Sequence, residues 1–571
     1  MGATAVQSLE ATYTGSERLY IRLFPSLTDL IFLLPAFLIL FILDGTKILL
    51  ADGDTGWHIR TGEWILKNRT VPTTDLFSFT KPHETWFSWE WGWDLLFAPV
   101  HQIWGLPGVA FVNLLLLCLI SALLYRLVRR CCENDILALL FTAIALFGST
   151  IHWLARPHLF SWLFLLLFSH ALLSAEEGKR KALLWLPLLM LAWVNTHGAF
   201  FIGIFMVLTS AIGEVLTVFA AEGQFHWPVA YRRARPYLLC TLACVGVSFI
   251  NPYTWHLHRH VFGYLRDSQL LDQIQEYQSI SFHHGVAVFF EGMLLLGAVA
   301  AVWCLHRARF AAAILIVVWA HLALVSARNI PIFLFIAAPW IACMVRDALS
   351  SYRASGWVSR FRTAAVDVYR ELKPIERIRR WHLVSVVAVL FMACSFAKGN
   401  HKFEADFDAK RFPVHAIPAI QAIKDAHVFT YDQWGDYLIY RLYPSTRVFV
   451  DGRGEFYGSA FLLRCQHLLN GAYNWETELK RFDVNTVLLK TDAPLSEVLK
   501  ESHNWKVVFD DGSAILFRAT LHLGHGPTAP FQDSTRFSPG FNDGGKQFAA
   551  FSVRKLTISN LQRVTHERRN L

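Results

Sequence analysis

Charged residues are scarce in this chain. Only 17% of its 571 residues are Asp, Glu, Lys or Arg, whereas 54% are hydrophobic and 14% are aromatic. Soluble proteins carry about 25% charged residues and about 45–50% apolar ones, so the scarcity excludes a disordered, fibrous or ordinary cytosolic protein. The apolar residues form separated runs of roughly 15–23 residues, the length that crosses a hydrocarbon layer of ~30 Å as a helix. This pattern predicts a multi-spanning membrane protein.

The nine cysteines lack the paired spacing of a zinc site or a disulfide framework. Nearly all of them lie within or beside apolar runs, so we expect them to pack as small apolar residues. The N-terminus lacks the short apolar core and the small-residue cleavage site of a secretory signal, so we expect the first apolar run to remain as an anchor. The sequence also shows no internal repeat.

The apolar runs predict an α-helical polytopic protein of about eleven spans. Lys and Arg in short loops favour the cytoplasmic side of a membrane, and every second loop of this chain is basic. We therefore expect a cytoplasmic N-terminus and an extracytoplasmic C-terminal part. The net charge of +9 then reflects the basic cytoplasmic loops. It does not indicate a nucleic-acid partner, because such a surface would gather Lys and Arg on one face. The predicted spans cover residues 28–48, 106–128, 136–153, 156–174, 182–196, 199–220, 236–250, 287–305, 311–326, 330–345 and 382–398.

Four regions follow from this pattern: a cytoplasmic N-terminus at 1–27, a transmembrane domain at 28–399, an extracytoplasmic domain at 400–520 and a poorly ordered tail at 521–571. The first outside loop covers residues 49–105. Alternating and β-branched residues in the third region predict a small α/β domain. Its predicted strands lie at 427–431, 447–450, 484–489, 505–509 and 514–518, and its predicted helices at 434–443 and 494–501.

Polar and ionisable side chains gather at the predicted outside ends of the spans. Such positions are costly, so they are candidates for function; the alternative is that single His and Asn residues only cap helices or contact headgroups. The set consists of Asp52, Asp54, Arg156, His158, Asn195, His197, Asn251, His256, His258, Arg259, Arg328 and Asn329.

The first outside loop carries the most informative acids. Asp52 and Asp54 follow the first span directly, where they could accept a proton, bind a divalent cation, hold a cationic partner or form a solvated turn about Gly53. Four tryptophans at residues 86–93 are typical of an interfacial belt on an in-plane helix. Glu90 lies among them, and anchoring does not require a carboxylate, so it is a further acidic candidate.

The acidic pair after the first span, the helical loop before the second, about eleven spans and an outside C-terminal domain together resemble the GT-C membrane glycosyltransferases. Residues 52–80, 431–438 and 448–453 resemble segments of a bacterial group of these enzymes, the group that includes protein O-mannosyltransferases, lipid A aminoarabinose transferases and Rgt-like transferases. The resemblance implies a transferase of the bacterial inner membrane. Its donor would be a sugar on a polyprenyl phosphate, and its acceptor a glycan, lipid or protein.

The resemblance also implies roles for residues. Asp54 or Asp52 would act as general base toward the acceptor hydroxyl, with Glu90 as another catalytic candidate, and transfer would need no cofactor or metal ion. The departing lipid phosphate needs cationic or hydrogen-bonding groups, and the arginine fork suits phosphate oxygens. The candidates for contact with the lipid phosphate or substrate are Arg156, His158, His197, His256, Arg259 and Arg328.

The C-terminal domain contains Asp432, Trp434, Asp436, Asp451 and Arg453. These residues could bind an acceptor or saccharide, but a turn with a local ion pair at 451–453 and a core tryptophan explain them more simply.

Two other functions compete with a transferase. A transporter or flippase for a lipid-linked saccharide should carry ionisable residues in mid-span and inverted repeats, and neither is visible. A non-catalytic envelope assembly protein would use the outside domain as its working part. Mutation of both loop aspartates separates these functions from a transferase, because only a transferase requires a base at that position.

Overall fold

The computed structural model describes residues 14–43, 45–223, 226–283, 285–351, 374–376, 378, 380–398 and 403–520. The predicted tail at 521–571 lies outside the described residues, as does most of the basic segment after residue 351. Within the described part, helices make up most of the chain up to residue 398, and the named strands all follow residue 427.

Each of the eleven predicted spans falls on a helix. Seven helical stretches in the described ranges are long and apolar enough to cross a membrane, and two further apolar helices are shorter. Together with a separate sheet, this confirms a polytopic helical membrane protein with a small α/β domain. The helices are α3 (Leu27–Phe37), α5 (Trp91–Cys132), α6 (Asp135–Ser149), α7 (His158–Glu176), α8 (Leu186–Thr196), α9 (Phe201–Glu222), α10 (Trp227–Ser248), α13 (Ala287–His306), α14 (Phe310–Val325), α15 (Ile330–Ser351) and α17 (Leu383–Lys398).

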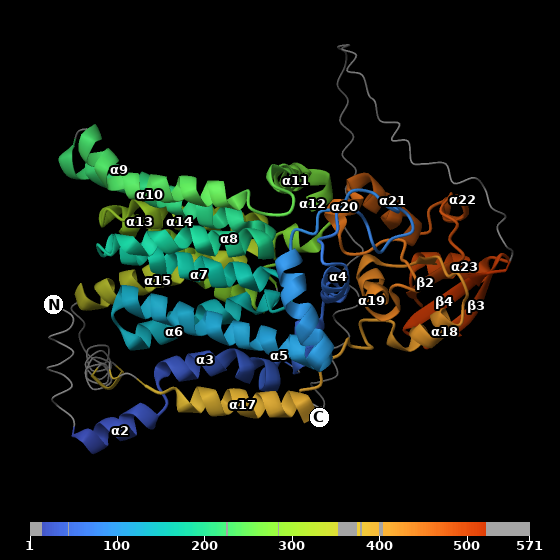
Figure 1. The fold of residues 1–571 in the computed structure, drawn as a ribbon, viewed down its shortest axis with the longest axis horizontal. Helices are drawn as coiled ribbons and strands as arrows, with labels where there is room; N and C mark the ends of the chain where they lie inside the picture. Colours follow the sequence, from blue (N-terminus) through green and yellow to red (C-terminus); the bar gives the residue numbers. More distant parts are fainter. Residues whose placement is uncertain are drawn as a thin grey trace, which may run out of the picture. The chain divides into compact units, whose positions relative to one another are not determined.

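The long helix α5 consists of two arms. Gly105 interrupts it with a positive φ of 63°, a backbone conformation that glycine adopts at little cost. The arm after Gly105 coincides with the predicted second span. This arm contacts its neighbours along the bundle, and Figure 1 shows α3, α6, α7 and α15 side by side there. The free cysteines are nearly all buried, as predicted.

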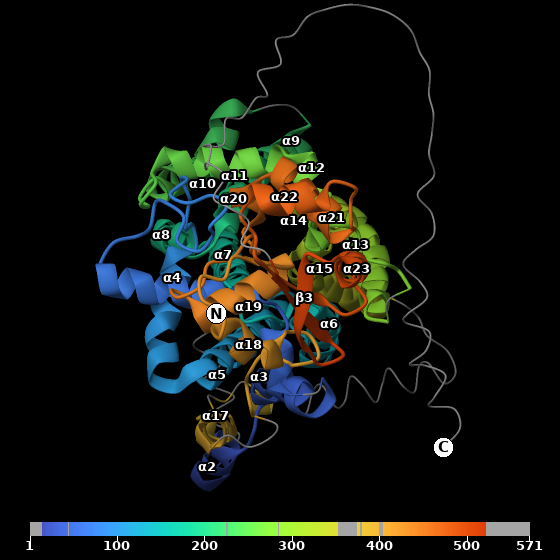
Figure 2. The same cartoon turned by 90° about the vertical axis from the view of Figure 1, so that its right-hand side faces the viewer.

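A four-stranded sheet forms the centre of the C-terminal domain, which faces the viewer in Figure 2. Its order is β1 (Val428–Phe429), β2 (Thr486–Lys490), β4 (Ala514–Ala519) and β3 (Trp505–Asp510). β1 is parallel to β2, and the other neighbours are antiparallel, with Val487 opposite Phe517. The helices around it are α18 (Ile417–Gln421), α19 (Asp432–Leu442), α20 (Gly454–Tyr457), α21 (Ser459–Leu469), α22 (Trp475–Arg481) and α23 (Pro494–Glu501).

The predicted strand at 447–450 is wrong. Val448 makes only isolated bridges, one to Val428 and one to Ser78 of the first loop. Its amide donates to the carbonyl of Phe77, and its carbonyl accepts from Phe79. The first loop therefore takes the place that a neighbouring strand would fill.

The first loop and the C-terminal domain share a buried ion-pair network. Arg453 is 1% exposed, and its guanidinium lies 2.7 Å from both Asp75 in the loop and Asp451 in the domain. It also lies over the ring of Trp86, 4.5 Å from the ring centroid. The local pair predicted at 451–453 is thus present, and it extends to the loop.

The tryptophan-rich segment does not form the predicted interfacial belt. Trp86 and Trp93 are almost fully buried, and the segment before Trp91 is not helical. Trp86 packs edge-on against Trp57, and Trp93 stacks on Phe97. The C-terminal domain and the helix α4 (Asp54–Asn68) cover this part of the loop, which a sequence pattern cannot reveal.

We predict that Arg453→Met weakens the folded state by about 3–5 kcal/mol, because it leaves Asp75 and Asp451 buried without a countercharge. Urea unfolding in detergent would measure the loss. Arg481→Met is the matched control, since the Arg481 pair with Glu478 is half exposed and should contribute about 0–1 kcal/mol. Equal losses in the two variants would contradict the prediction.

Candidate active site

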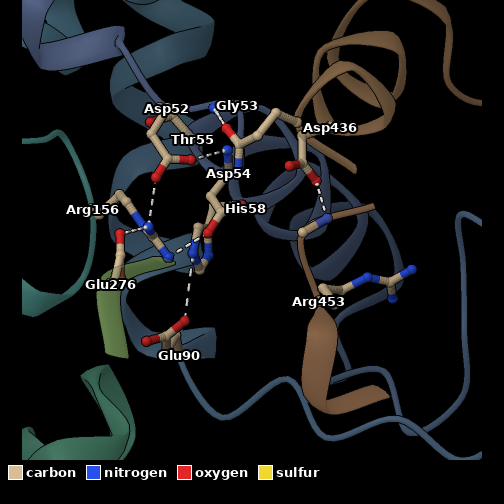
Figure 3. A network of polar contacts seen from close by, with 12 residues as sticks. Asp52, Gly53, Asp54, Thr55, His58, Glu90, Arg156, Glu276, Asp436 and Arg453 are labelled. Carbon is tan, nitrogen blue, oxygen red and sulfur yellow. Dashed lines mark hydrogen bonds and ion pairs between the residues drawn. The ribbon is translucent and has the colours of Figure 1, made fainter. Parts of the chain in front are cut away.

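Arg156 is the centre of a cluster of carboxylates (Figure 3). Its Nη1 lies 2.6 Å from Asp52 Oδ2 and 3.0 Å from Glu276 Oε1. Its Nη2 forms an ion pair with Asp54 Oδ2. Three chain segments therefore meet at one guanidinium: the end of the first span, the turn before α7 and a short turn at Gln275–Tyr277.

Hydrogen bonds from backbone amides hold the segment with the two loop aspartates in place. The Asp54 amide donates to Asp52 Oδ1 at 2.9 Å, and the Gly53 amide donates to Gln433 Oε1 at 2.8 Å. The chain does turn about Gly53, but the turn is covered by α19 and paired with Arg156. The alternative of a solvated turn is therefore wrong.

Burial and charge shift the pKa values of the acids in opposite directions. Burial raises the pKa of Asp54 well above its ordinary value, although the positive charge of Arg156 opposes the shift. Burial would also raise the pKa of Glu276, but Arg156 together with His152 and Arg328 outweighs burial and holds that pKa well below the usual range. The cluster thus combines a carboxylate that keeps its charge with one that has a high proton affinity.

Glu90 lies between two imidazoles at the start of α5. Its Oε2 is 3.4 Å from His58 Nε2, and its Oε1 is 3.4 Å from His197 Nε2. Burial raises the pKa of Glu90 to about 7, again against the charge of Arg156. A carboxyl group with this pKa can give or take a proton near neutral pH.

His58 connects Glu90 to a second buried acid. Its Nδ1 lies 2.6 Å from Asp94 Oδ1, and both side chains are fully buried. Burial lowers the pKa of His58 well below its usual value, so the ring is neutral. His58 was not among the predicted site residues, although it lies one helical turn after Asp54 on α4.

The structure brings some predicted phosphate contacts to this cluster. Arg328 Nη1 lies 3.0 Å from the Tyr277 hydroxyl and 3.8 Å from Glu276, so it is linked to Arg156 through Glu276. His197 contacts Glu90. His158 is buried behind Arg156, where its Nε2 donates to the His152 carbonyl oxygen at 2.8 Å.

His256 and Arg259 lie elsewhere. Both are exposed on α11 (Trp255–Arg266), and the His256 ring stacks on Trp255. No contact of the described residues links either side chain to Asp52, Asp54 or Glu90.

Two acids were not predicted to join the cluster: Glu276 was not a candidate, and Asp436 was a candidate only for binding an acceptor or saccharide. Glu276 lies in a loop without a motif, and only its contact with Arg156 identifies it. Asp436 of α19 faces Asp54, and its Oδ1 accepts from the Gly452 amide at 2.8 Å. The sequence placed Asp436 in the outside domain and gave no register against the first loop.

The cluster is arranged around a guanidinium. Across the described ranges, no group of three or more His, Cys, Asp or Glu side chains has the arrangement of a metal site. Asp52, Asp54 and Glu276 converge instead on Arg156, which supplies the positive charge among them.

No protein-family model matches the sequence, and no curated protein matches it. Among solved structures, the chain is similar to the oligosaccharyltransferase of Archaeoglobus fulgidus tethered with an acceptor peptide. The two share 12% identity with a TM-score of 0.52, over 86% of this chain and 74% of that one. The chain has a GT-C fold. A second structure from that organism, AglB with an inhibitory peptide and a dolichol-phosphate, is 13% identical with a TM-score of 0.48, over 81% of this chain and 69% of that one.

The predicted GT-C architecture is therefore confirmed. The narrower likeness to aminoarabinose and Rgt-like transferases stays a prediction. In this GT-C chain, the carboxylate cluster joins the loop after the first helix to the C-terminal domain.

We predict that Arg156→Met destabilises the protein most at alkaline pH. Without the guanidinium, burial and mutual repulsion raise the folded pKa values of Asp54 and Glu276 above the unfolded values of about 3.9–4.3. The destabilisation is then present above the folded pKa values and is lost as pH falls through them.

Thermal melts of wild type and variant at pH 5 and pH 8 would test this. Arg307→Met is the control, because its pair with Asp347 is exposed and should leave the melting temperature nearly unchanged at both values. A deficit of Arg156→Met that is independent of pH would count against the prediction.

Proposed function

We propose that the protein is an integral-membrane glycosyltransferase that moves a sugar from a polyprenyl-phosphate carrier to an acceptor at the extracytoplasmic face. The observation that carries the proposal is the convergence of Asp52, Asp54 and Arg156 beside Arg328 in a GT-C fold. Acidic groups for an acceptor hydroxyl and cationic groups for a phosphate lie at the same ends of the helices.

Asp54 is the general base in this proposal. A base works best when its pKa approaches the working pH, and burial raises the pKa of Asp54 far above that of an ordinary aspartate. Asp52 contacts the same guanidinium and orients Asp54 by accepting from its amide. Glu90, with a pKa of about 7, is a second group able to move a proton.

Arg328 is the main phosphate contact in this proposal. Arg156 already faces three carboxylates, whereas Arg328 has one ion pair at 3.8 Å among the described residues and is a quarter exposed. Its guanidinium can therefore turn toward the phosphate that leaves the anomeric carbon. In a metal-dependent transferase, a metal cation would balance the negative charge of such acids. In this protein Arg156 supplies that positive charge, so we propose a reaction without a metal cofactor.

A membrane preparation with a polyprenyl-phosphate sugar tests the base. We expect Asp54→Asn to lower the transfer rate by about 10²–10⁴-fold, the usual contribution of a general base. Asp406→Asn is the control, because this half-exposed acid pairs with Arg441 outside the cluster. Full transfer after joint replacement of Asp52 and Asp54 would refute the role of the loop acids. Transport of the lipid-linked sugar without transfer would favour a flippase.

The proposed orientation places the N-terminus in the cytoplasm and the C-terminal domain outside a plasma membrane. It is supported by the basic loops at one end of the helices, at residues 126–130, 179–181 and 232–235, and by the cluster at the other. In intact cells, an impermeant maleimide should label Tyr473→Cys, which is fully exposed in the domain, but not Lys179→Cys. Both variants need Cys394→Ala, because Cys394 is exposed. Labelling of Lys179→Cys before lysis would reverse the orientation.

A further inference from the structure

We propose that Asp436 of the C-terminal domain is a positioning residue that shares one proton with Asp54, so that docking of this domain sets the charge of the base. The catalytic meaning of this inference rests on the proposed function. The shared proton itself can be observed without any transfer reaction.

The two carboxyl groups face each other with one unpartnered oxygen each. Asp54 uses Oδ2 for Arg156, and Asp436 uses Oδ1 for the Gly452 amide. Asp54 Oδ1 and Asp436 Oδ2 are both buried, and no donor of the described residues reaches either atom. The residues are 4% and 0% exposed.

Gly452 shows how close the two oxygens lie. A Cβ atom built on this glycine would be 2.1 Å from Asp54 Oδ1 and 2.7 Å from Asp436 Oδ2. The two oxygens are therefore at most 4.8 Å apart, the sum of these two distances. Because glycine has only a hydrogen atom in place of a Cβ, both oxygens fit beside residue 452.

One proton makes this arrangement favourable. Two ionised carboxylates at this distance repel each other, and neither can donate a hydrogen bond. A single proton turns one carboxyl into a donor and the other into its acceptor. Burial raises the pKa of both groups. The charge of Asp54 raises the pKa of Asp436 further, whereas a hydrogen bond from Asp436 lowers that of Asp54, as expected when Asp436 is the donor.

The surrounding charges favour retention of this proton. Arg156 is the cation that faces Asp54, whereas Asp52 and Glu276 lie on the same side as further acids. On the side of the C-terminal domain, Asp436 faces Asp432 and Asp451. Arg453 pairs with Asp451, so four further acids face two cations, Arg156 and Arg453, and a bound proton offsets the excess negative charge.

The docking of α19 on α4 fixes the pair. A Cβ on Gly53 would lie 2.4 Å from the Gln433 carbonyl oxygen, and one on Gly56 would lie 2.8 Å from that of Asp436. The two helices are thus in backbone contact, and Arg60 also donates to the Tyr440 carbonyl. Asp436 can reach Asp54 only when the C-terminal domain lies on this helix.

The shared proton gives the pair a defined role in transfer. The pair carries one proton and one negative charge before the reaction. The acceptor hydroxyl proton moves to Asp54 as the acceptor oxygen bonds to the anomeric carbon and the bond from that carbon to the phosphate oxygen breaks. The pair then holds two protons and returns one to solvent after the product leaves.

Infrared difference spectra of the full chain in detergent at neutral pH test the shared proton. The amide group that Asp436→Asn introduces would donate to Asp54 Oδ1, and the one that Asp54→Asn introduces would donate to Asp436 Oδ2. Each replacement therefore keeps the remaining acid ionised, and we expect each to remove the same single protonated-carboxyl band. Asp432→Asn, on the same helix as Asp436, should leave that band in place. Persistence of the band in either of the first two variants would overturn the shared proton.

The pH dependence of stability separates proton sharing from simple packing. The folded pair has raised pKa values, so the wild type loses stability as pH rises through them. Asp436→Asn should remove this loss, and its melting temperature relative to wild type should be higher at pH 8 than at pH 5. An equal fall at both pH values would show a purely structural residue and would overturn the proposal.

Gly452→Ala gives an independent check of the geometry. Its methyl group would displace the pair, so it should abolish the shared band, whereas Gly454→Ala should retain it because the nearest atoms there are 3.5 Å away. An intact band in Gly452→Ala would contradict the proposed contact. These measurements need no sugar donor, so a failure of the transferase assay leaves their result standing.

Discussion

The burial of Arg156 among carboxylates is the constraint on which the site depends. A guanidinium away from water needs countercharges, and a single carboxylate near it would leave donors unused. Asp52 and Asp54 belong to one segment and Glu276 to another far along the chain, and all three carboxylates contact the same guanidinium. Their joint attraction to Arg156 brings together the end of the first span, the turn before α7 and the loop before α13.

Arg453 plays a similar part at the second junction. It pairs with Asp75 and Asp451 and lies over Trp86, so the first loop becomes part of the C-terminal domain. The loop thus contacts both the helix bundle and the sheet. For a transferase this means that the proposed base lies in direct contact with the C-terminal domain, where Asp436 can act on Asp54.

Much of the membrane part could be predicted because its signals are local. A span needs only a long apolar run, so all eleven predicted spans fall on helices. The orientation expected from the basic loops stays a prediction. The strands at 428–429, 486–490 and 505–519 were also predictable from alternation and turn residues. The segment at 447–450 was not, because its hydrogen bonds go to the first loop. The tryptophans at 86 and 93 were assigned to the membrane surface because composition cannot show that another domain covers them.

The sequence by itself determined a membrane protein and the positions of its helices. It also predicted Asp52, Asp54, Glu90, Arg156 and Arg328 as site residues, since isolated charges in an apolar chain are conspicuous. Only the tertiary structure decided which charges meet. Glu276, His58 and Asp436 join the site, while His256 and Arg259 stay on an exposed helix. The physical reason is that electrostatic pairing depends on distances of a few ångströms between segments far apart in the chain, such as those of Asp75 and Arg453, which lie 378 residues apart.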